Sequence, residues 1–384
     1  MSKEPREGAV EKRKIEPLDA EVSLLGFGLM RLPVKGEDKS RIDYPAAERM
    51  VDMAYRAGVN YYDTAYPYHE GKSEVFVGDV FSKYKRESFY LASKMPTWEV
   101  VNSEAGVKRI FDEQLAKCGV SYFDFYLAHS FDPEHLERFR RFNMYDFLRK
   151  KKEEGLIRRL GFSFHSNPEL LAEVVENYEW DFAQIQLNYI DWDLLNAKRF
   201  YEYLTSRKLP VIVMEPVRGG ALASLNDRAG KILKKAAPDS SLASWAIRFA
   251  ASLPNVMTVL SGMSSAEQVE DNLKTMTAFK PLSEGERALL GEAAAAYNAA
   301  GTVPCTGCRY CMDCPAGVDI PAVFRQYNYY HLSGKKDDFI NTYRYLRERE
   351  KAHNCTSCGR CVRLCPQGIA VPEFMKEITA FAAG

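Results

Sequence analysis

Short apolar runs alternate with amphipathic segments from about residue 20 to residue 280. Eight runs rich in β-branched and aromatic residues have the length of buried strands, at residues 22–29, 59–63, 89–94, 123–129, 159–165, 182–188, 211–215 and 256–261. Segments with helical spacing of apolar positions follow them, at residues 45–56, 73–84, 106–117, 134–154, 168–178, 194–207, 240–251 and 266–279. This alternation is typical of an α/β protein and predicts a closed (β/α)8 barrel, the TIM barrel. No G-x-G-x-x-G follows the first run, which disfavours an open dinucleotide-binding sheet.

The pattern changes after the last strand and helix pair. Residues 283–300 are predicted to form a connecting helix, and residues 301–384 a small, mainly helical domain with helices near 320–332 and 338–353. Residues 1–19, with the basic run Lys12-Arg13-Lys14, are expected to form a solvated N-terminal tail. The barrel is therefore assigned to residues 20–282.

Eight of the nine cysteines lie in two tight runs, at Cys305, Cys308, Cys311 and Cys314 and at Cys355, Cys358, Cys361 and Cys365. Thiolates three residues apart converge on one small inorganic core, so two runs of four predict two 4Fe-4S clusters. Structural zinc sites usually place two ligands, a long gap and two more, which disfavours zinc here. Disulfides suit small secreted domains, whereas this chain has 384 residues and no apolar signal segment after Met1.

The second cysteine run has the spacing of bacterial ferredoxins, in which the fourth cysteine ligates the other cluster. By that rule one cluster takes Cys305, Cys308, Cys311 and Cys365, and the other takes Cys355, Cys358, Cys361 and Cys314. The first run has two residues rather than three before Cys314, so the crossed assignment of Cys314 and Cys365 stays open. The region resembles the helical two-cluster ferredoxin modules that are appended to larger redox enzymes. We expect it to act as an electron relay.

Composition narrows the class of partner. The chain has 52 basic and 52 acidic residues, so its overall charge predicts neither nucleic acid nor a membrane surface as a partner. It is 46% hydrophobic without an apolar run of transmembrane length, which is typical of a soluble globular protein. Thiolates in this number, with clusters that oxygen attacks, point to a reducing cytoplasm.

Polar residues stand at the carboxyl ends of the predicted strands, where TIM barrels place their chemistry. They are Asp63, Lys94, His129, Ser163, His165, Gln186, Asn188, Glu215 and Ser261. Each alone could be a rim or core residue, but as a convergent set they predict a site. Arg218 follows Glu215-Pro216 and is expected either to clamp an anionic group or to pair with Glu215.

Three motifs that include these strand ends resemble those of the catalytic tetrad of the aldo-keto reductases. They are Asp63 with Thr64, Ala65 and Tyr68; Lys94 in Ala92-Ser93-Lys94; and His129 in Tyr126-Leu127-Ala128-His129. The resemblance covers residues 20–282, includes Gly78, Gly161-Phe162-Ser163 and Pro216 with Gly220, and with the cysteine tail is similar to the iron–sulfur branch of that superfamily. It implies an oxidoreductase that reduces a small-molecule carbonyl or oxidises an alcohol.

The chemistry of the four residues agrees with that implication. A nearby ammonium such as Lys94 is expected to lower the pKa of the Tyr68 phenol, which is ordinarily near 10. Asp63 would hold Lys94 charged, and His129 would hydrogen-bond the substrate oxygen. Tyr66 competes with Tyr68, and only the five-residue interval from Asp63 favours Tyr68.

The resemblance also implies a cofactor pocket, in which this chain departs from the family. The implied contacts are Ser163, Gln186, Met214, Gly262, Glu267 and Asn272. Phe164 replaces the asparagine of the family's Gly-x-Ser-Asn motif, Met214 replaces a stacking aromatic residue, and Gly262 and Gln268 replace residues that are basic in some members. A 2′-phosphate wants lysine or arginine, so among nicotinamides NADH is favoured over NADPH.

A flavin stays open as the barrel cofactor, because flavins couple two-electron and one-electron chemistry. An external ferredoxin or another redox partner is expected to exchange electrons with the clusters. The alternative hypothesis is an electron-transfer or redox-sensing protein whose barrel has lost its catalytic activity.

Overall fold

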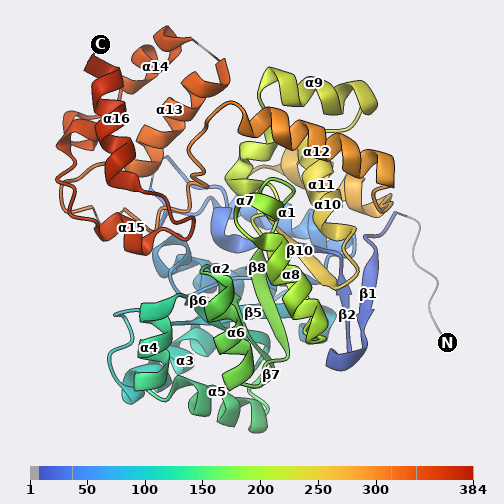
Figure 1. Ribbon diagram of the computed structural model, residues 1–384. Helices are drawn as coiled ribbons and strands as arrows, with labels where there is room; N and C mark the ends of the chain where they lie inside the picture. Colours follow the sequence, from blue (N-terminus) through green and yellow to red (C-terminus); the bar gives the residue numbers. More distant parts are fainter. Residues whose placement is uncertain (1–7, 37, 313, 334, 384) are drawn as a thin grey trace. The chain divides into compact units, whose positions relative to one another are not determined.

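The computed structural model describes residues 8–36, 38–312, 314–333 and 335–383 (Figure 1). The chain divides into two compact units. The first is formed by Met1–Pro216 with Ser244–Leu282, and the second by Val217–Ala243 with Ser283–Gly384. The second unit thus includes a segment of the predicted barrel region, and the predicted boundaries at residues 19, 282 and 300 stay predictions.

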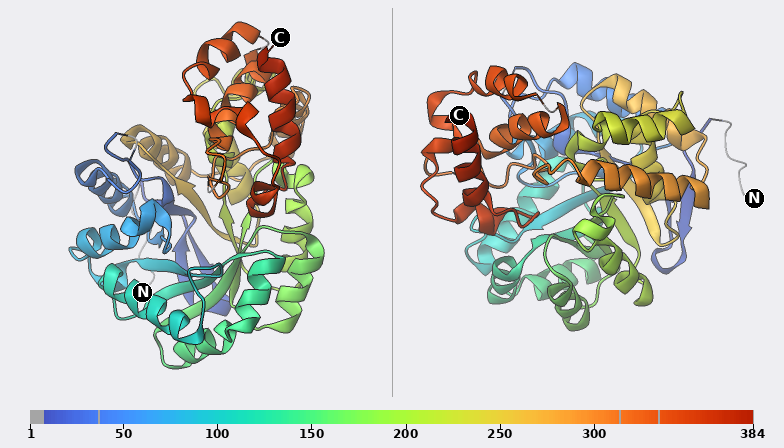
Figure 2. Two further views of the ribbon diagram at one scale, coloured as in Figure 1. Left: turned by 90° about the vertical axis from the view of Figure 1, so that its left-hand side faces the viewer. Right: turned by 45° about the horizontal axis from the view of Figure 1, so that its top comes forward.

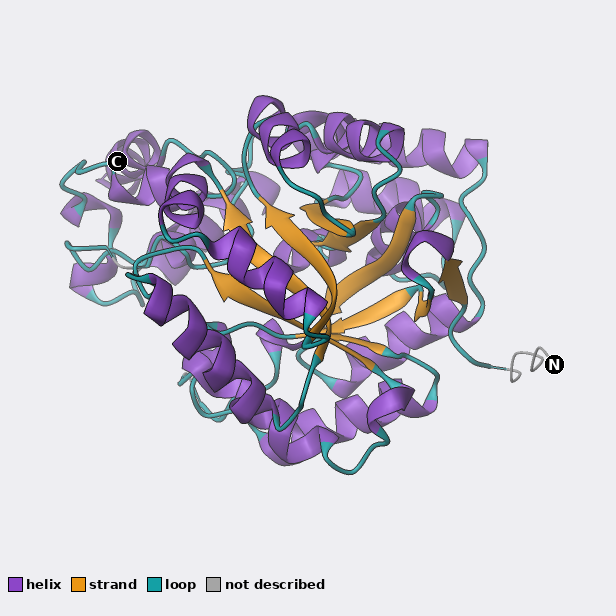
Figure 3. Cartoon of the chain, turned by 90° about the horizontal axis from the view of Figure 1, so that it is seen from below, coloured by secondary structure: helices purple, strands orange, loops and turns teal. Residues whose placement is uncertain are grey.

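Eight parallel strands close into a barrel in the first unit, which confirms the predicted TIM-barrel fold. The strands are β3 (Leu25–Gly28), β4 (Tyr61–Asp63), β5 (Tyr90–Pro96), β6 (Phe123–Phe131), β7 (Ile157–Phe164), β8 (Phe182–Gln186), β9 (Val211–Met214) and β10 (Val256–Gly262). They follow one another in chain order, and β10 pairs with β3 to close the ring. Figure 3 shows the strands surrounded by helices.

The helices of the first unit follow the strands in the predicted order (Figure 2). They are α1 (Tyr44–Arg56), α2 (Lys72–Phe81), α3 (Glu104–Cys118), α4 (Pro133–Arg141), α5 (Met144–Glu153), α6 (Pro168–Asn177), α7 (Asp191–Leu194), α8 (Ala197–Ser206), α10 (Leu242–Ala251) and α11 (Ala266–Thr277). The predicted helix 134–154 is two helices, because Asn143 lies between them in the left-handed region at φ 49°. At Gly78 the backbones of α2 and α3 approach so closely that a Cβ would overlap the carbonyl oxygen of Lys117.

A hairpin covers the amino ends of the strands. β1 (Lys12–Ile15), the turn η1 (Glu16–Leu18) and β2 (Ala20–Ser23) form it, so the predicted strand 22–29 is divided between this hairpin and β3. Arg13 donates hydrogen bonds to the carbonyls of Ala251, Leu253 and Val256, and is therefore not part of a solvated tail. Residues 1–7 of the predicted tail lie outside the described residues.

The second unit is helical. It contains the turn η5 (Arg218–Ala223), α9 (Asp227–Ala236), α12 (Glu284–Asn298), α13 (Ile320–Ser333), α14 (Lys336–Tyr343), the turns η6 (Glu348–Glu350) and η7 (Ala352–Asn354), α15 (Arg360–Leu364) and α16 (Val371–Ala383). Val323, Phe324 and Phe339 lie in its core with Met375 and Ile378. The predicted helix 338–353 ends early because the chain turns back, and the Ala352 N–H donates to the Tyr343 hydroxyl at 2.7 Å.

Within the described part of the chain, no helix is long and apolar enough to cross a membrane.

Candidate active site and cysteine sites

Three neighbouring strands bring a carboxylate, an ammonium and an imidazole to the carboxyl end of the barrel. Asp63 ends β4, Lys94 lies in β5 and His129 lies in β6. Tyr68 begins η3 (Tyr68–Gly71), a few residues after β4. All four residues are buried, and Tyr68 is the most exposed at 9%. The structure therefore groups the four residues that the sequence motifs singled out.

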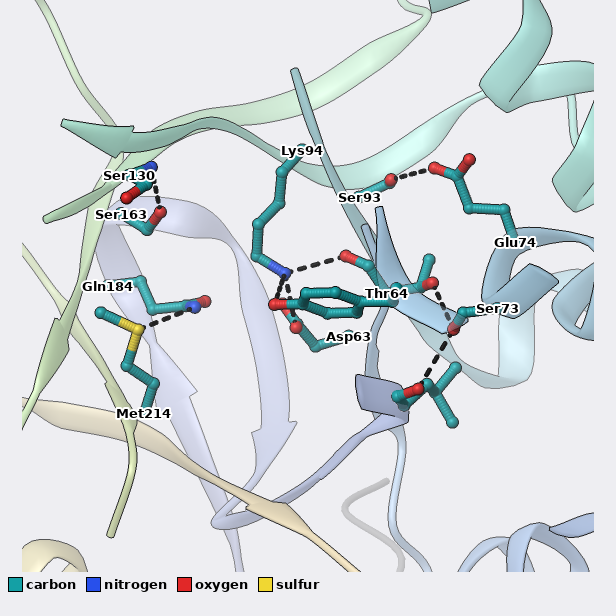
Figure 4. Close-up of polar contacts among 12 residues, drawn as sticks. Asp63, Thr64, Ser73, Glu74, Ser93, Lys94, Ser130, Ser163, Gln184 and Met214 are labelled. Atoms are coloured by element: carbon teal, nitrogen blue, oxygen red, sulfur yellow. Dashed lines mark hydrogen bonds and ion pairs between the residues drawn. The ribbon is translucent and has the colours of Figure 1, made fainter. Parts of the chain in front are cut away.

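The Lys94 ammonium is the centre of this group (Figure 4). Its Nζ donates to Asp63 Oδ1 at 2.6 Å, to the Thr64 carbonyl at 2.8 Å and to the Tyr68 hydroxyl at 3.4 Å. An ammonium has three N–H donors, so these three acceptors satisfy it. The Asp63 carboxylate and the Thr64 carbonyl thus hold the ammonium beside the Tyr68 phenol.

Of the two neighbouring tyrosines, Tyr68 is the one that reaches Lys94. The Tyr66 hydroxyl instead donates to Glu113 Oε2 at 3.0 Å, and Lys117 Nζ lies 4.2 Å from the centre of its ring. The Tyr66 side chain therefore packs against charged residues of α3. The geometry favours Tyr68 as the phenol of the site.

The turn that presents Tyr68 has an unusual backbone. His69 and Glu70 both have left-handed backbone angles, with φ of 52° and 54°. The His69 ring holds the turn, because its Nε2 accepts from the Leu32 N–H at 3.1 Å and its Nδ1 lies 2.8 Å from the Lys39 carbonyl. An accepting Nε2 requires the proton on Nδ1, which then donates to Lys39. Burial lowers the pKa of His69, which keeps this ring neutral.

His129 lies at an irregular point of β6. The pairing of β6 with β7 shifts register between Ala128 and Phe131, and Ser130 has a φ of 64°. Ser163 Oγ accepts from the Ser130 N–H at 2.7 Å and so fixes this bulge. Bulges re-aim side chains, and here the His129 ring faces the Tyr68 ring edge-on with 6.0 Å between ring centres.

Burial dominates the electrostatics of the group. It raises the pKa of Asp63 and lowers the pKa of Lys94, and in each case the partner's charge opposes the shift. Burial also holds the pKa of His129 well below its ordinary value, with the Lys94 charge acting in the same direction. His129 is therefore neutral near pH 7.

The pKa of the Tyr68 phenol is raised, whereas the sequence motifs predicted that it would be lowered. Burial raises its pKa well above the ordinary value of 10, the Asp63 and Glu215 charges raise it further, and Arg31 opposes them. The loss of water around a buried phenolate outweighs the nearby positive charge. Tyr68 thus holds its proton firmly in the protein at rest.

Sequence reasoning missed a buried polar network behind Lys94. Glu74 is fully buried, and its Oε1 accepts from Ser93 Oγ at 2.7 Å and from Gln114 Nε2 at 2.5 Å. Gln114 Nε2 also lies 3.1 Å from the Lys94 carbonyl oxygen. The available signal was a polar residue on the apolar face of each predicted helix, Glu74 on α2 and Gln114 on α3.

Several residues of the expected cofactor pocket already have partners within the protein. Ser163 Oγ accepts from the Ser130 N–H, and Gln186 Nε2 donates to Asp191 Oδ2 at 2.8 Å. Met214 ends β9 half-buried, and its sulfur accepts from Gln184 Nε2 at 3.5 Å. A half-buried thioether suits contact with a flat ring, so Met214 fits the role of a ring support.

The adenine-side residues lie around the tip of β10. Gly262 ends β10, opposite Gly28 of β3. Glu267 is exposed in the first turn of α11, where a hydrogen bond from Ser265 lowers the pKa of its carboxyl. Asn272 is buried and donates to Ser261 Oγ at 2.9 Å. Gly262 is exposed, and the Arg31 side chain packs against it.

Two further residues named from the sequence lie in different units. His165 follows β7 in the first unit, and burial, reinforced by His135, lowers its pKa to about 4. Arg218 is buried in the second unit, at the start of η5. The ninth cysteine, Cys118, is buried at the end of α3, as expected of a small apolar side chain.

The cysteines of the second unit form two neighbourhoods. Burial raises the pKa of the Cys311 thiol, and the negative charges of Cys308, Cys305 and Cys365 raise it further. The Cys361 thiol is raised likewise by burial, and then by Cys355, Cys358 and Cys314. A pocket lies beside the second neighbourhood, and it is lined by Cys311 of the first neighbourhood as well as by Cys314, Cys355, Cys358 and Cys361.

The thiols that act on Cys311 and on Cys361 are those expected in the crossed ferredoxin arrangement, in which each run lends its last cysteine to the other set, and this assignment stays a prediction. In the part of the chain that the structure describes, no three side chains of metal-binding type lie close enough to hold a single metal ion. Eight clustered thiols in two sets fit iron–sulfur chemistry, since thiolates are the ligands that such clusters take.

The barrel and the buried Asp63–Lys94–Tyr68 group define the chain as an oxidoreductase of the TIM-barrel class. Comparison with known proteins makes the class specific. The Aldo/keto reductase family matches residues 24–294, so the chain belongs to this family. A 4Fe-4S dicluster domain matches residues 304–370.

Relatives and solved structures match over the barrel. The chain is 25% identical to the "Uncharacterized oxidoreductase YqkF" of Bacillus subtilis over 73% of this chain and 95% of that protein. It is 24% identical to L-galactose dehydrogenase of Arabidopsis thaliana over 73% of this chain and 92% of the relative. The structure of aldo-keto reductase AKR11C1 from Bacillus halodurans, in its holo form, superposes with a TM-score of 0.59 at 27% identity, covering 74% of this chain and 96% of that one.

Proposed function

We propose that the barrel reduces the carbonyl group of a small molecule to an alcohol, or catalyses the reverse oxidation. The observation that carries the proposal is the buried Lys94 ammonium, which donates to Asp63 and also to the Tyr68 hydroxyl. A fully buried cation is costly to keep, and it is explained if a negative charge develops on the phenol during the reaction. Asp63, Tyr68, Lys94 and His129 are the proposed catalytic residues.

In the direction of reduction, Tyr68 donates its proton to the carbonyl oxygen. Lys94 Nζ, 3.4 Å from the phenol oxygen, stabilises the phenolate that remains, and Asp63 holds the ammonium in place. Neutral His129 donates a hydrogen bond to the same substrate oxygen. A nicotinamide held by Ser163, Gln186 and Met214 would supply the hydride that the carbonyl carbon takes up. One hydride and one proton account for the alcohol formed.

The raised pKa of Tyr68 is consistent with the role of acid. A phenol whose pKa lies well above 7 carries its proton in nearly every molecule at neutral pH, so the donor is always loaded. In the oxidation direction the same shift opposes the phenolate that must accept the alcohol's proton.

For the cofactor we propose a nicotinamide dinucleotide, with NADH favoured over NADPH. Ser163, Gln186 and Met214 would hold the nicotinamide end, and Gly262, Glu267 and Asn272 the adenosine end. Gly262 and Gln268 carry no charge, so the loop lacks the basic side chains that a 2′-phosphate requires. Fluorescence titration of the purified protein with NADH and NADPH tests this preference, and tighter binding of NADPH would overturn it.

For the second unit we propose two 4Fe-4S clusters that exchange single electrons with an external ferredoxin or another redox partner. One cluster is assigned to Cys305, Cys308, Cys311 and Cys365, and the other to Cys314, Cys355, Cys358 and Cys361. The support is the mutual effect of these thiols on one another's pKa in those two sets. About eight iron and eight acid-labile sulfide per anaerobically prepared chain are expected. Half that content would leave one cluster.

A second candidate function is an electron-transfer or redox-sensing protein with an inactive barrel. Phe164, which stands where the family has an asparagine, favours it, as do the internal hydrogen bonds of Ser163 and Gln186. Anaerobic turnover of NADH with a panel of short aldehydes and ketones separates the two functions. We expect Tyr68→Phe to lower kcat by about 10²–10⁴-fold and Tyr66→Phe to leave it within about twofold.

An inactive barrel would give no turnover and no NADH binding in the wild-type protein. The same titrations should include FMN and FAD, because a tightly bound flavin would replace the nicotinamide in this proposal. Cys355→Ala with Cys358→Ala tests the relay: turnover that depends on reduced ferredoxin should be lost, while NADH-dependent turnover should remain. If both rates are unchanged, the clusters have only a structural role.

A further inference from the structure

One cation at the barrel mouth has no part in the proposed tetrad. Arg31 ends the short turn η2 (Leu29–Arg31), which follows β3 directly. Its side chain is 30% exposed, so it is held by the protein and still reachable from solvent. Its charge is close enough to act on the Tyr68 phenol. Arg31 therefore belongs to the mouth in which a substrate or cofactor would bind.

The stem of Arg31 lies across Gly262. A Cβ at position 262 would come within 3.2 Å of Arg31 Cδ, 3.3 Å of Cγ and 3.4 Å of Cβ. Contacts this short mean that the Arg31 stem would have to shift by a few tenths of an ångström to admit a Cβ at position 262. Gly262 itself carries no charge, but its lack of a side chain makes room for the Arg31 side chain, which comes from the turn after β3.

The adenine-side loop is bonded to the Arg31 backbone. Ser264 Oγ donates to the Arg31 carbonyl at 2.8 Å, and the Ser264 N–H donates to Gln268 Oε1 at 2.7 Å. Gln268, the second position without a basic side chain, therefore helps to hold the loop against Arg31. These two hydrogen bonds hold the adenine-side loop and the Arg31 backbone together.

The guanidinium end of Arg31 reaches the tip of the neighbouring strand β9. Its Nη2 lies 3.4 Å from Oε1 of Glu215, whose φ of 54° follows the end of β9. Charge-assisted bonds between guanidinium and carboxylate are usually about 2.7–2.9 Å, so this pair is loose. The positive charge thus lies between the tips of β9 and β10, and not out along α11, where Glu267 and Asn272 stand.

We propose that Arg31 binds the bridging diphosphate of a dinucleotide, in the gap between the ends of β9 and β10. A planar guanidinium offers paired N–H donors to phosphate oxygens, and it can leave a loosely held carboxylate for a more highly charged partner. The inference rests on the proposed nicotinamide cofactor and names a residue for its phosphates. Because the diphosphate is common to NADH and NADPH, Arg31 serves both.

Binding is measured by calorimetry on the cluster-loaded full chain, with NADH, NADPH, ADP and reduced nicotinamide riboside as probes. Arg31→Gln should weaken NADH, NADPH and ADP by about 10- to 100-fold, and Arg31→Lys by less. Reduced nicotinamide riboside has no phosphate and should be unaffected. Glu215→Gln removes the competing charge and should tighten ADP binding severalfold. Arg41→Gln, an exposed arginine on the same connection, is the matched control.

The outcomes distinguish the diphosphate site at Arg31 from the proposed nicotinamide function. A loss confined to NADPH would assign Arg31 to the 2′-phosphate and overturn the diphosphate site, as would unchanged affinity for all probes in a variant with wild-type circular dichroism. If the wild type binds ADP through Arg31 but not NADH, this inference stands and the nicotinamide function fails. If it binds none of the probes, both fail. Arg31→Gly with Gly262→Arg, which returns a cation to the loop, should restore part of the lost affinity.

Discussion

Removing one charge of the Asp63–Lys94 pair should destabilise the fold, whereas removing both charges together should leave its stability nearly unchanged. The two side chains are 4% and 0% exposed, and Nζ lies 2.6 Å from Oδ1. Lys94→Met leaves a buried carboxylate without its ammonium, and Asp63→Asn leaves a buried ammonium without its carboxylate. Each single variant should lower the free energy of unfolding by about 3–5 kcal/mol.

The double variant, Asp63→Asn with Lys94→Met, should behave differently. It has no buried charge at the site, so the desolvation that raises the pKa of Asp63 and lowers that of Lys94 no longer acts on it. Buried ion pairs replaced by uncharged residues of similar volume are often neutral or stabilising. We therefore expect unfolding within about 1 kcal/mol of wild type, and a coupling energy of at least about 3 kcal/mol between the two sites.

Lys94→Met should also change how stability depends on pH. Burial raises the pKa of Asp63, and loss of the Lys94 charge removes what opposes it. An acid whose folded pKa is raised stabilises the fold below its unfolded value of about 3.9, and this contribution is lost as pH rises through the folded pKa. The variant should be most stable near pH 4 and lose about 1.4 kcal/mol per pH unit above that, up to the folded pKa.

The assay is urea unfolding followed by tryptophan fluorescence. All four tryptophans, Trp98, Trp180, Trp192 and Trp245, belong to the first unit, so the signal reports the barrel. The exposed pair Lys108–Asp112, with side chains 66% and 51% exposed, is the matched control, and its single variants should each change stability by less than about 0.5 kcal/mol. A double variant as unstable as the sum of the two singles would refute the reasoning, because the charges would then act independently.

Three further measurements test other parts of the structure. Gly78→Ala should lower barrel stability by about 1–3 kcal/mol in the same assay, because its Cβ meets the Lys117 carbonyl, and an unchanged midpoint would contradict the close approach of α2 and α3. Cys311→Ser should remove about half of the iron and sulfide, whereas Cys118→Ser should remove none, and equal losses would contradict two separate thiol sets. Turnover should show no titration of His129 between pH 6 and 7, because its pKa lies well below 6.5, and an acid limb that has its midpoint near 6.5 and disappears in His129→Asn would contradict a neutral imidazole.

The barrel was predictable because each strand and helix carries its own apolar period. The elements that were predicted wrongly depend on single residues, whose effect does not appear in the spacing of apolar positions. Asn143 turns the chain between α4 and α5 in the left-handed region, inside a stretch whose apolar spacing continues through it. Arg13 looks like part of a charged tail, and its donors are used by backbone carbonyls about 240 residues later in the chain.

The candidate site was predictable to the extent that strand ends define it. Asp63, Lys94 and His129 stand at such ends, and a closed parallel barrel brings them to one face. The choice between Tyr66 and Tyr68 depends on the left-handed turn at His69, which no local pattern announces. The direction of the Tyr68 pKa shift depends on how deeply the phenol is buried, whereas the sequence indicates only that a lysine is near.

The cofactor pocket shows a different limit of position-by-position reasoning. β3 and β10 are the first and last strands of the barrel, and they become neighbours only when the ring closes. Arg31 and Gly262 are more than 230 residues apart in the chain, yet the stem of one covers the backbone of the other. A phosphate responds to charge at a point in space, not at a sequence position. Gly262 and Gln268 therefore bear only on the 2′-phosphate, and the cation proposed for the diphosphate comes to the same strand tip from the first strand of the barrel.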